Sequence, residues 1–359
     1  MYKYTHLIPQ NIAPKGTKQI GIYDSNDKRV MGILLGKLKY PTDTKLYSFG
    51  LISDIHLWGT EPSWKANTKF DNVLSHFENQ GCAFCCVNGD LTQTGFYQRT
   101  VESDASTTYL DEGQLAKYKE ICDKHFIPVY EIAGNHESYY SMPITDNLDK
   151  WDTYTGKNVL GYTISQDNDL FILVGQPRGS LPMTDVDLQW LYETLENNRN
   201  KRCFIFVHPH ISSGNPLGAY TSNNFFVGWG TKTTAFKNLL SHYKNTVLFH
   251  GHSHFIFECQ EYDEIANYSD NDGFKSIHIP SLSRPCDIID GVRTTQDGKS
   301  QGYIVDVYAD YIVLNGIDFI NNKPVPLGVF KIDTPLVTVE ANTFTDSTGT
   351  IITNQGGTN

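Results

Sequence analysis

The chain has 359 residues, of which 39% are hydrophobic and 19% charged, with 21 Tyr and 19 Phe. This length and composition allow a full buried core, as one large domain or two modest ones, and exclude a disordered protein. The formal net charge of −11 disfavours long nucleic acids as ligands, because their polyanionic backbone would be repelled.

The N-terminal segment predicts neither a signal peptide nor a membrane anchor. No apolar stretch follows its first six residues, and no window approaches the ~18 apolar residues that a membrane span needs. We therefore expect a cytoplasmic protein. Residues 1–45 predict a small β-hairpin module, because QIGIYDSNDKRVMGILLG turns at its central polar residues and then resumes a strand pattern.

Apolar runs of strand length then recur along the chain. They cover residues 46–55, 83–87, 127–132, 170–174, 203–207 and 246–249. The C-x-x-C of Cys82 and Cys85, a pattern found in zinc and redox sites, overlaps the second run. No second pair completes four zinc ligands, so reduced core cysteines are the favoured interpretation.

Helical patterns separate several of these runs. The first is expected to be capped by Ser63 and closed by Gly81. Capping boxes at residues 111–114 and 184–187 predict two further helices, and an apolar stripe within 231–243 predicts a fourth. This alternation predicts an α/β domain over residues 46–335, with a largely parallel central sheet, followed by a loose tail at 336–359.

Polar side chains stand where five of the predicted strands end. In chain order they are Asp54, His56, Asp90, Asn135, His136, His208, His252 and His254. Alone, each would be an ordinary hydrogen-bonded histidine, helix cap or turn residue. Together they predict a site, because ligands bind outside the carboxyl ends of parallel strands, which meet at one sheet edge.

The residue types indicate transition metals. Carboxylates, imidazoles and an amide oxygen, without thiolate, suit Mn, Fe or Zn. Seven of these groups exceed what one tetrahedral ion takes but suffice for two, provided that one carboxylate bridges. Two metal ions about 3.5–4 Å apart suit in-line attack on phosphorus. Two divalent cations against two carboxylates leave a formal surplus of about +2, which would attract a phosphate.

The sequence resembles the calcineurin-like metallophosphoesterases from about residue 46 to residue 333. Five blocks in family order carry the resemblance: Asp54-x-His56, Gly89-Asp90, Gly134-Asn135-His136-Glu137, His208 and Gly251-His252-x-His254. The resemblance implies a four-layer αββα sandwich built on βαβαβ units. It also implies a phosphoric ester hydrolase that uses two divalent or trivalent transition-metal ions.

The resemblance assigns a role to each site residue. It implies that Asp54, His56 and His254 hold one ion and that Asp90 bridges the pair. His136 would lie just outside the metals, donating a proton to the leaving oxygen or stabilising the phosphoryl charge. A metal-activated hydroxide would attack the phosphomonoester or phosphodiester bond of a small substrate.

The second ion would be held by Asn135, His208 and His252. His210 competes with His208 for this role, but the family places its ligand directly after the strand, which favours His208.

The segment FHGHSH places His250, His252 and His254 at alternate positions. Alternation along an extended chain would turn His252 and His254 to different sides, each toward its own ion. His250 has no role in the family, and we expect it to be structural.

Two departures from the motifs of particular family branches make those branches less fitting. Ser/Thr protein phosphatases have Gly where this chain has Leu57, and purple acid phosphatases have a Tyr ligand where it has Gln93. A bacterial-type branch that acts on small phosphomonoesters and phosphodiesters remains. We hypothesise that the polar loop 92–110 overhangs the metals and restricts substrate size, with Tyr97 and Arg99 as candidate contacts.

A second resemblance concerns phosphoesterase-like proteins encoded among phage or prophage tail genes. The phrases IPSLSRP and GYIVDVYADYIVLNGIDF carry it. It implies an alternative function, a virion-associated structural protein with other virion proteins as partners. The intact site residues argue against a purely structural role, because the two carboxylates would repel each other without metal.

Overall fold

A computed structural model gives the fold of the chain. It describes residues 19–23, 29–34, 44–93, 97–99, 108–110, 112–138, 151–176, 184–209, 232–261, 267–270, 273–289, 292–341, 344–345 and 351–352. The chain divides into two compact units, Met1–Thr44 and Lys45–Asn359. In the first unit, β1 (Gln19–Tyr23) and β2 (Arg29–Leu34) pair antiparallel, which confirms the predicted hairpin.

The second unit contains two six-stranded sheets. The first has the order β18-β17-β16-β3-β4-β7. Its strands are β3 (Tyr47–Ile52), β4 (Cys85–Val87), β7 (Val129–Glu131), β16 (Gln301–Val307), β17 (Tyr311–Asp318) and β18 (Lys323–Asp333). β3, β4 and β7 run parallel, whereas β16 pairs antiparallel with β3 and continues into the antiparallel β17 and β18.

The second sheet has the order β12-β13-β11-β10-β9-β8. Its strands are β8 (Gly161–Gln166), β9 (Asp169–Val174), β10 (Cys203–Val207), β11 (Thr246–His250), β12 (Tyr268–Ser269) and β13 (Lys275–His278). The four central strands are parallel, and the edge strands β8 and β12 are antiparallel to their neighbours.

Helices and short strand pairs complete the described part of this unit. The helices are α1 (Ala66–Asn79), α2 (Glu112–Cys122), α4 (Asp185–Asn197), α6 (Thr233–His242), the helical residues 151–155, and the 3-10 helices η1 (His136–Ser138) and η3 (Phe257–Glu261). The strand pairs are β5 (Tyr97–Arg99) with β6 (Thr108–Leu110), β14 (Cys286–Ile289) with β15 (Val292–Thr295), and β19 (Phe344–Thr345) with β20 (Ile351–Ile352).

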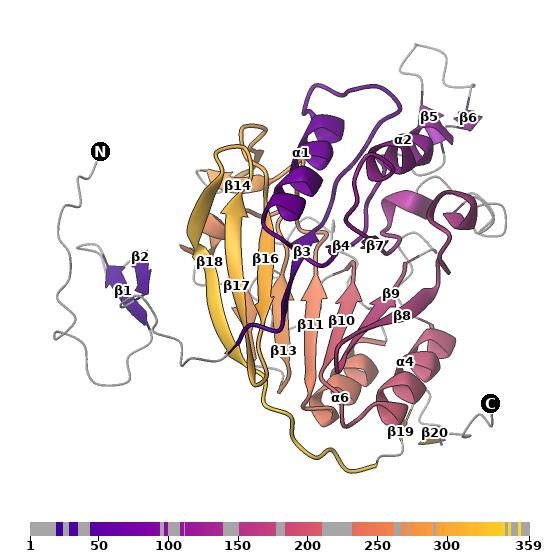
Figure 1. The fold of residues 1–359 in the computed structure, drawn as a ribbon, viewed down its shortest axis with the longest axis vertical. Coiled ribbons are helices and arrows are strands. Elements are labelled where there is room, and N and C mark those ends of the chain that lie inside the picture. Colours follow the sequence, from indigo (N-terminus) through magenta and orange to yellow (C-terminus); the bar gives the residue numbers. More distant parts are fainter. Residues whose placement is uncertain are drawn as a thin grey trace. The chain divides into compact units, whose positions relative to one another are not determined.

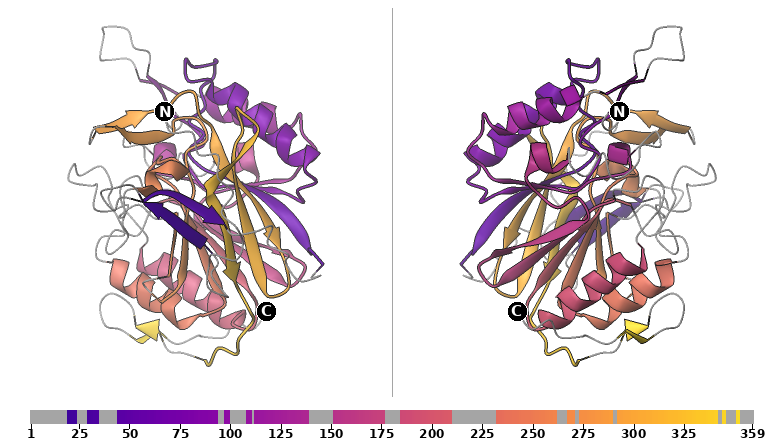
Figure 2. Two further views of the ribbon diagram at one scale, coloured as in Figure 1. Left: turned by 90° about the vertical axis from the view of Figure 1, so that its left-hand side faces the viewer. Right: turned by 90° about the vertical axis from the view of Figure 1, so that its right-hand side faces the viewer.

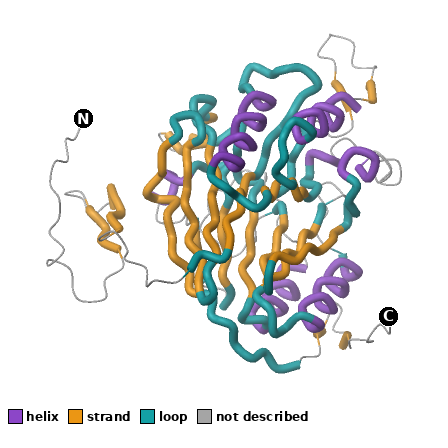
Figure 3. The backbone as a smooth tube through the Cα atoms, viewed as in Figure 1, coloured by secondary structure: helices purple, strands orange, loops and turns teal. Residues whose placement is uncertain are grey.

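The sheets stack face to face between two layers of helices (Figures 1 and 2). In β10, Phe204 and Phe206 join the core between the sheets, whereas Ile205 and Val207 join the core beneath α4 and α6. This follows from the two-residue period of a strand, which sends neighbouring side chains to opposite faces. Figure 3 shows α1 and α2 on one side of the strands and α4 and α6 on the other. The αββα sandwich is thus confirmed.

The prediction of one largely parallel central sheet is wrong. Of the six predicted strands, the first three form the centre and one edge of the first sheet, and the last three lie in the second. The predicted strands of both sheets place side chains in a core on each face, so they are similarly apolar and the pattern cannot separate the sheets. The antiparallel strands β16 to β18 were not among the predicted runs.

The helix boundaries were predicted in part. Thr184 and Asp187 form the expected capping box of α4, and Gly81 follows α1 with a positive φ of 69°. The Ser63 cap is wrong, because α1 begins after Lys65, whose backbone N–H donates to the Pro62 carbonyl in a preceding turn. Asp111, of the predicted capping box at residues 111–114, lies outside the described residues.

Candidate metal centre

The predicted site residues come together where strands of both sheets end. β3, β4 and β7 of the first sheet lead to Asp54, Asp90 and Asn135 and their neighbours, and β10 and β11 of the second lead to the histidines. The site therefore lies at the carboxyl ends of two stacked sheets, not at one edge of a single sheet.

The backbone at this site is strained. The residues concerned are Asp54, His56, Asp90, His252 and His254, whose φ angles lie between 51° and 68°. They are five of the eight non-glycine residues with such angles in the described part of the chain. Non-glycine residues rarely adopt this left-handed conformation, and such strain clusters at functional sites.

The prediction that His252 and His254 alternate along an extended strand is wrong. β11 ends at His250, and His252 and His254, which follow it, both have a left-handed backbone conformation. Their rings nevertheless face different partners. Nδ1 of His252 lies 3.2 Å from Nε2 of His208, whereas Nε2 of His254 lies 3.1 Å from Nε2 of His56.

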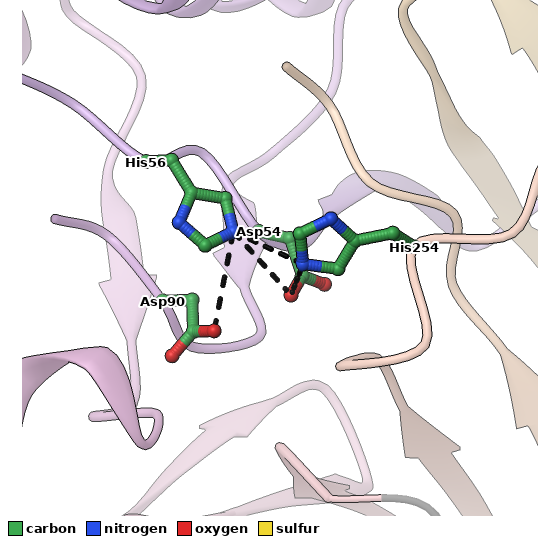
Figure 4. Close-up of side chains that lie close together, drawn as sticks. All are labelled: Asp54, His56, Asp90 and His254. Atoms are coloured by element: carbon green, nitrogen blue, oxygen red, sulfur yellow. Dashed lines mark hydrogen bonds and ion pairs between the residues drawn. The ribbon is translucent and has the colours of Figure 1, made fainter. Parts of the chain in front are cut away.

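One group of possible metal ligands comprises Asp54, His56, Asp90 and His254, whose ligand atoms all lie within 4.8 Å of one another. Figure 4 shows these four side chains pointing toward a common centre. Oδ1 of Asp54 lies 3.1 Å from Nε2 of His254 and 3.9 Å from Nε2 of His56. Oδ2 of Asp90 lies 4.0 Å from the same His56 nitrogen.

A second group comprises Asp90, His208 and His252. Nε2 of His208 lies 3.1 Å from Oδ2 of Asp90 and 3.1 Å from Oδ1 of Asn135. The second group thus shares Asp90 with the first, and the amide oxygen of Asn135 faces it. All seven predicted ligands are therefore found together.

One oxygen of each carboxylate is held by the protein. Oδ2 of Asp54 accepts hydrogen bonds from the Ser53 hydroxyl and the His252 backbone N–H, and Oδ1 of Asp90 accepts one from the His136 backbone N–H. The other oxygens, Oδ1 of Asp54 and Oδ2 of Asp90, are buried and accept no hydrogen bond from the described residues. A buried carboxylate oxygen without a partner is costly, unless a cation binds it.

The histidine tautomers also suit a cation. Nδ1 of His208 lies 2.8 Å from the Asn88 carbonyl oxygen, and Nδ1 of His254 lies 3.0 Å from that of Arg284. A carbonyl only accepts, so each Nδ1 carries a proton and donates it. Each neutral ring then turns the lone pair of Nε2 toward the carboxylates, as in metal-binding histidines whose other nitrogen is held by the protein.

Without metal, the carboxylates draw protons to these rings. Burial alone lowers the pKa of His208, but the carboxylates of Asp90 and Asp54 raise it to about 10. Burial also lowers the pKa of His254, but the carboxylate of Asp54 raises it to about 9. Burial and the neighbouring rings of His136 and His254 hold the pKa of His56 well below its usual value. The centre thus attracts positive charge, and its donor set fits metal ions.

His136 lies beside the ligand groups and belongs to neither. Its Nδ1 donates to the Gln93 carbonyl, and its Nε2 lies 3.9 Å from Oδ2 of Asp90. Its side chain is 19% exposed, whereas those of His56 and His208 are fully buried. A molecule bound at the centre can therefore reach the His136 ring.

The supporting roles of Glu137, named only as part of the third block, and of Ser281 were not predicted from the sequence. Glu137 is buried and accepts hydrogen bonds from the backbone N–H groups of Thr92 and Gly134, which joins the second and third blocks. Burial, then the charge of Asp90, raises its pKa to about 7. Ser281, in the IPSLSRP segment, donates to the Asp54 carbonyl. The segment thus contacts the backbone of a proposed metal ligand, a role that its resemblance to tail proteins did not predict.

Other described residues named in the sequence analysis do not belong to the two ligand groups. His250 is buried in β11, with its ring centroid 5.8 Å from that of His278. Cys85 and Cys86 are buried in β4 with free thiols, and Oε1 of Gln93 accepts a hydrogen bond from Nη1 of Arg284 at 3.4 Å. His210 and the side chains of Tyr97 and Arg99 lie outside the described residues. No described helix has the length and apolar character needed to cross a membrane.

Gly134 packs directly against Asp90 and leaves no room for a side chain. A Cβ at residue 134 would lie 2.2 Å from Oδ1 of Asp90 and 2.4 Å from its backbone nitrogen. Gly134→Ala is expected to lower the free energy of unfolding by about 1–3 kcal/mol, as overpacking does, and to reduce metal content. Urea unfolding and elemental analysis would measure both. Gly298→Ala is the matched control, because a Cβ there meets nothing within 4 Å. Equal behaviour of the two variants would contradict the prediction.

Comparison with known proteins agrees with this geometry. A model of the calcineurin-like phosphoesterase family matches residues 47–255, more than half of the chain. The fold is similar to that of a dimetal phosphatase from Danio rerio, with a TM-score of 0.55 and 14% identity over 81% of this chain and 100% of that chain.

The fold is also similar to that of the purple acid phosphatase PPD1 from yellow lupin seeds, with a TM-score of 0.52 and 10% identity over 82% of this chain and 55% of that chain. A search of the curated proteins gives no match. At these identities the solved structures show likeness of fold alone, and the family model carries the assignment. The chain belongs to the calcineurin-like phosphoesterase family.

Proposed function

We propose that the protein is a phosphoric ester hydrolase that works with two transition-metal ions. The observation that carries this proposal is the position of Asp90, which belongs to both groups of possible ligands. A carboxylate shared between two sets of imidazole and oxygen donors is the arrangement that a two-metal hydrolytic site requires. Mn, Fe and Zn all suit this donor set.

The ligand roles follow from the two groups. Asp54, His56 and His254 would hold one ion, Asp90 would bridge, and the second ion would be held by the residues on the other side of Asp90. These are Asn135, His208 and His252. Once bound, the ions would supply an activated water and positive charge for the phosphoryl oxygens.

The substrate in this proposal is a small phosphomonoester or phosphodiester. Two divalent ions against Asp54 and Asp90 leave a local surplus of about +2. This surplus can attract a small anion to a protein whose net charge is −11, whereas a long polyanion would meet repulsion over the rest of the surface.

His136 would donate a proton or a hydrogen bond to the substrate. Its Nδ1 is engaged with the Gln93 carbonyl, so Nε2 is the atom that faces the centre. An imidazolium at this position donates from Nε2, either to the leaving oxygen or to a phosphoryl oxygen. The Gln93 carbonyl fixes the orientation of the ring during this transfer.

Elemental analysis combined with turnover tests the proposal. Protein stripped with a chelator and reloaded with Mn²⁺ or Zn²⁺ is expected to bind about two ions per chain and to hydrolyse chromogenic phosphate esters. The ions should also stabilise the fold, by about 2.7 kcal/mol at 100 times their dissociation constant. Turnover that persists in stripped protein would contradict the proposal. No comparison supports the tail-associated alternative.

A further inference from the structure

Arg284 lies at the rim of the metal centre, in the IPSLSRP segment and outside the residues that the family model covers. Its backbone carbonyl accepts a hydrogen bond from Nδ1 of His254, and its backbone N–H donates to the Ser281 hydroxyl. Ser281 in turn donates to the Asp54 carbonyl. The backbone of Arg284 is therefore fixed to the wall of the centre.

Its guanidinium group is held in a defined orientation. The Cζ atom lies 5.2 Å from the ring centroid of Trp64, and Nη1 lies 3.4 Å from Oε1 of Gln93. Trp64 is anchored in turn, because its Nε1–H donates to the His56 carbonyl at 3.4 Å. An arginine stacked on an aromatic ring loses little further freedom when it binds an anion.

These contacts connect Arg284 to two parts of the proposed site. Gln93, which its guanidinium meets, also holds His136 through its backbone carbonyl. The backbone of Arg284 holds His254, a ligand in the first group. Arg284 thus connects the residue proposed to protonate the leaving oxygen with the proposed metal ligands.

The charge of Arg284 is not neutralised by any described carboxylate within ion-pair distance. Its contacts are an amide oxygen and an indole face. Arg202 differs, because both Nε and Nη2 donate to the carboxylate of Asp169, and Arg199 pairs with Glu196. Arg284 is partly exposed, so an anion from solution can reach it.

We propose that Arg284 binds a non-bridging oxygen of the substrate phosphoryl group and so favours dianionic phosphomonoesters over monoanionic diesters. This inference rests on the proposed function. Arg284 adds one positive charge to the surplus at the metal centre, and a dianion gains more from it than a monoanion does. Guanidinium groups bind phosphate oxygens through two parallel N–H groups, which suits this position.

The test compares Arg284→Gln with the wild type, both loaded with Mn²⁺. We expect KM for 4-nitrophenyl phosphate to rise roughly 10- to 100-fold with kcat within about threefold, as for the loss of one charge-assisted hydrogen bond in ground and transition state alike. KM for bis(4-nitrophenyl) phosphate should rise by a smaller factor. Calorimetry with inorganic phosphate should show the same weakening as KM for the monoester. Arg284→Lys, which keeps the charge without the planar fork, should be intermediate.

The controls separate binding from folding. Metal content should stay unchanged in Arg284→Gln, because the bond to His254 uses a backbone carbonyl. Arg199→Gln, at the opposite end of β10 from His208, should match the wild type. Unchanged phosphate binding in Arg284→Gln, or equal losses for monoester and diester, would overturn the inference. A wild type that hydrolyses neither ester would refute the proposed function alone, because phosphate binding would still test Arg284.

Discussion

Replacing Asp90 with Asn is expected to abolish turnover and to leave fewer than two ions on the protein. Oδ2 of Asp90 lies 4.0 Å from Nε2 of His56 in the first group and 3.1 Å from Nε2 of His208 in the second, and it accepts no hydrogen bond from the described residues. Asn keeps the shape but removes the negative charge that holds the ions together. The loss in kcat should exceed the roughly 10²–10³-fold that removal of one transition-state donor costs.

The measurement is elemental analysis alongside kcat for a chromogenic ester. Asp123→Asn is the matched control, because Asp123 is exposed, directly follows α2 and pairs with Lys119 at 2.7 Å. Such a pair contributes about 0–1 kcal/mol to stability and should not affect turnover. Two bound ions and full turnover in Asp90→Asn would refute the two-metal proposal at its central residue.

The sequence predicted single elements better than their assembly. β10 matches its predicted run, and α4 begins at its predicted capping box. The division into two sheets depends on long-range pairing such as that of Tyr303 with Leu51, which no local pattern encodes. The alternation of side chains along each strand predicts which of them share a face. It does not predict which sheet lies against that face.

The centre could be predicted because its chemistry is carried by polar residues that follow apolar strands closely in the sequence. Aspartate, asparagine and histidine after an apolar run stand out, whatever the tertiary arrangement. Glu137 and Ser281 do not stand out, because their importance comes from burial and from hydrogen bonds to backbone atoms distant in sequence. Arg284 belongs to the same class, since only the fold brings it to Gln93.

His136→Ala is expected to lower kcat for an alkyl phosphate by roughly 10²–10⁴-fold, the usual contribution of a general acid, while both ions stay bound. The ring belongs to neither ligand group, so its removal leaves all seven proposed metal ligands in place. Elemental analysis and kcat check the two parts of this prediction. His242→Ala is the control, because His242 lies in the last turn of α6 and contacts the Glu340 carbonyl.

The choice of leaving group then separates the two roles open to His136. If Nε2 donates a proton to the leaving oxygen, the loss should be large for alkyl phosphates and small for 4-nitrophenyl phosphate, whose leaving group needs little protonation. If the ring instead stabilises the phosphoryl charge, both substrates should lose activity by a similar factor. The hydrogen bond to the Gln93 carbonyl engages Nδ1 in either role, so Nε2 is the acting atom in both and the comparison of substrates decides between them. Full turnover of an alkyl phosphate by His136→Ala would exclude both roles.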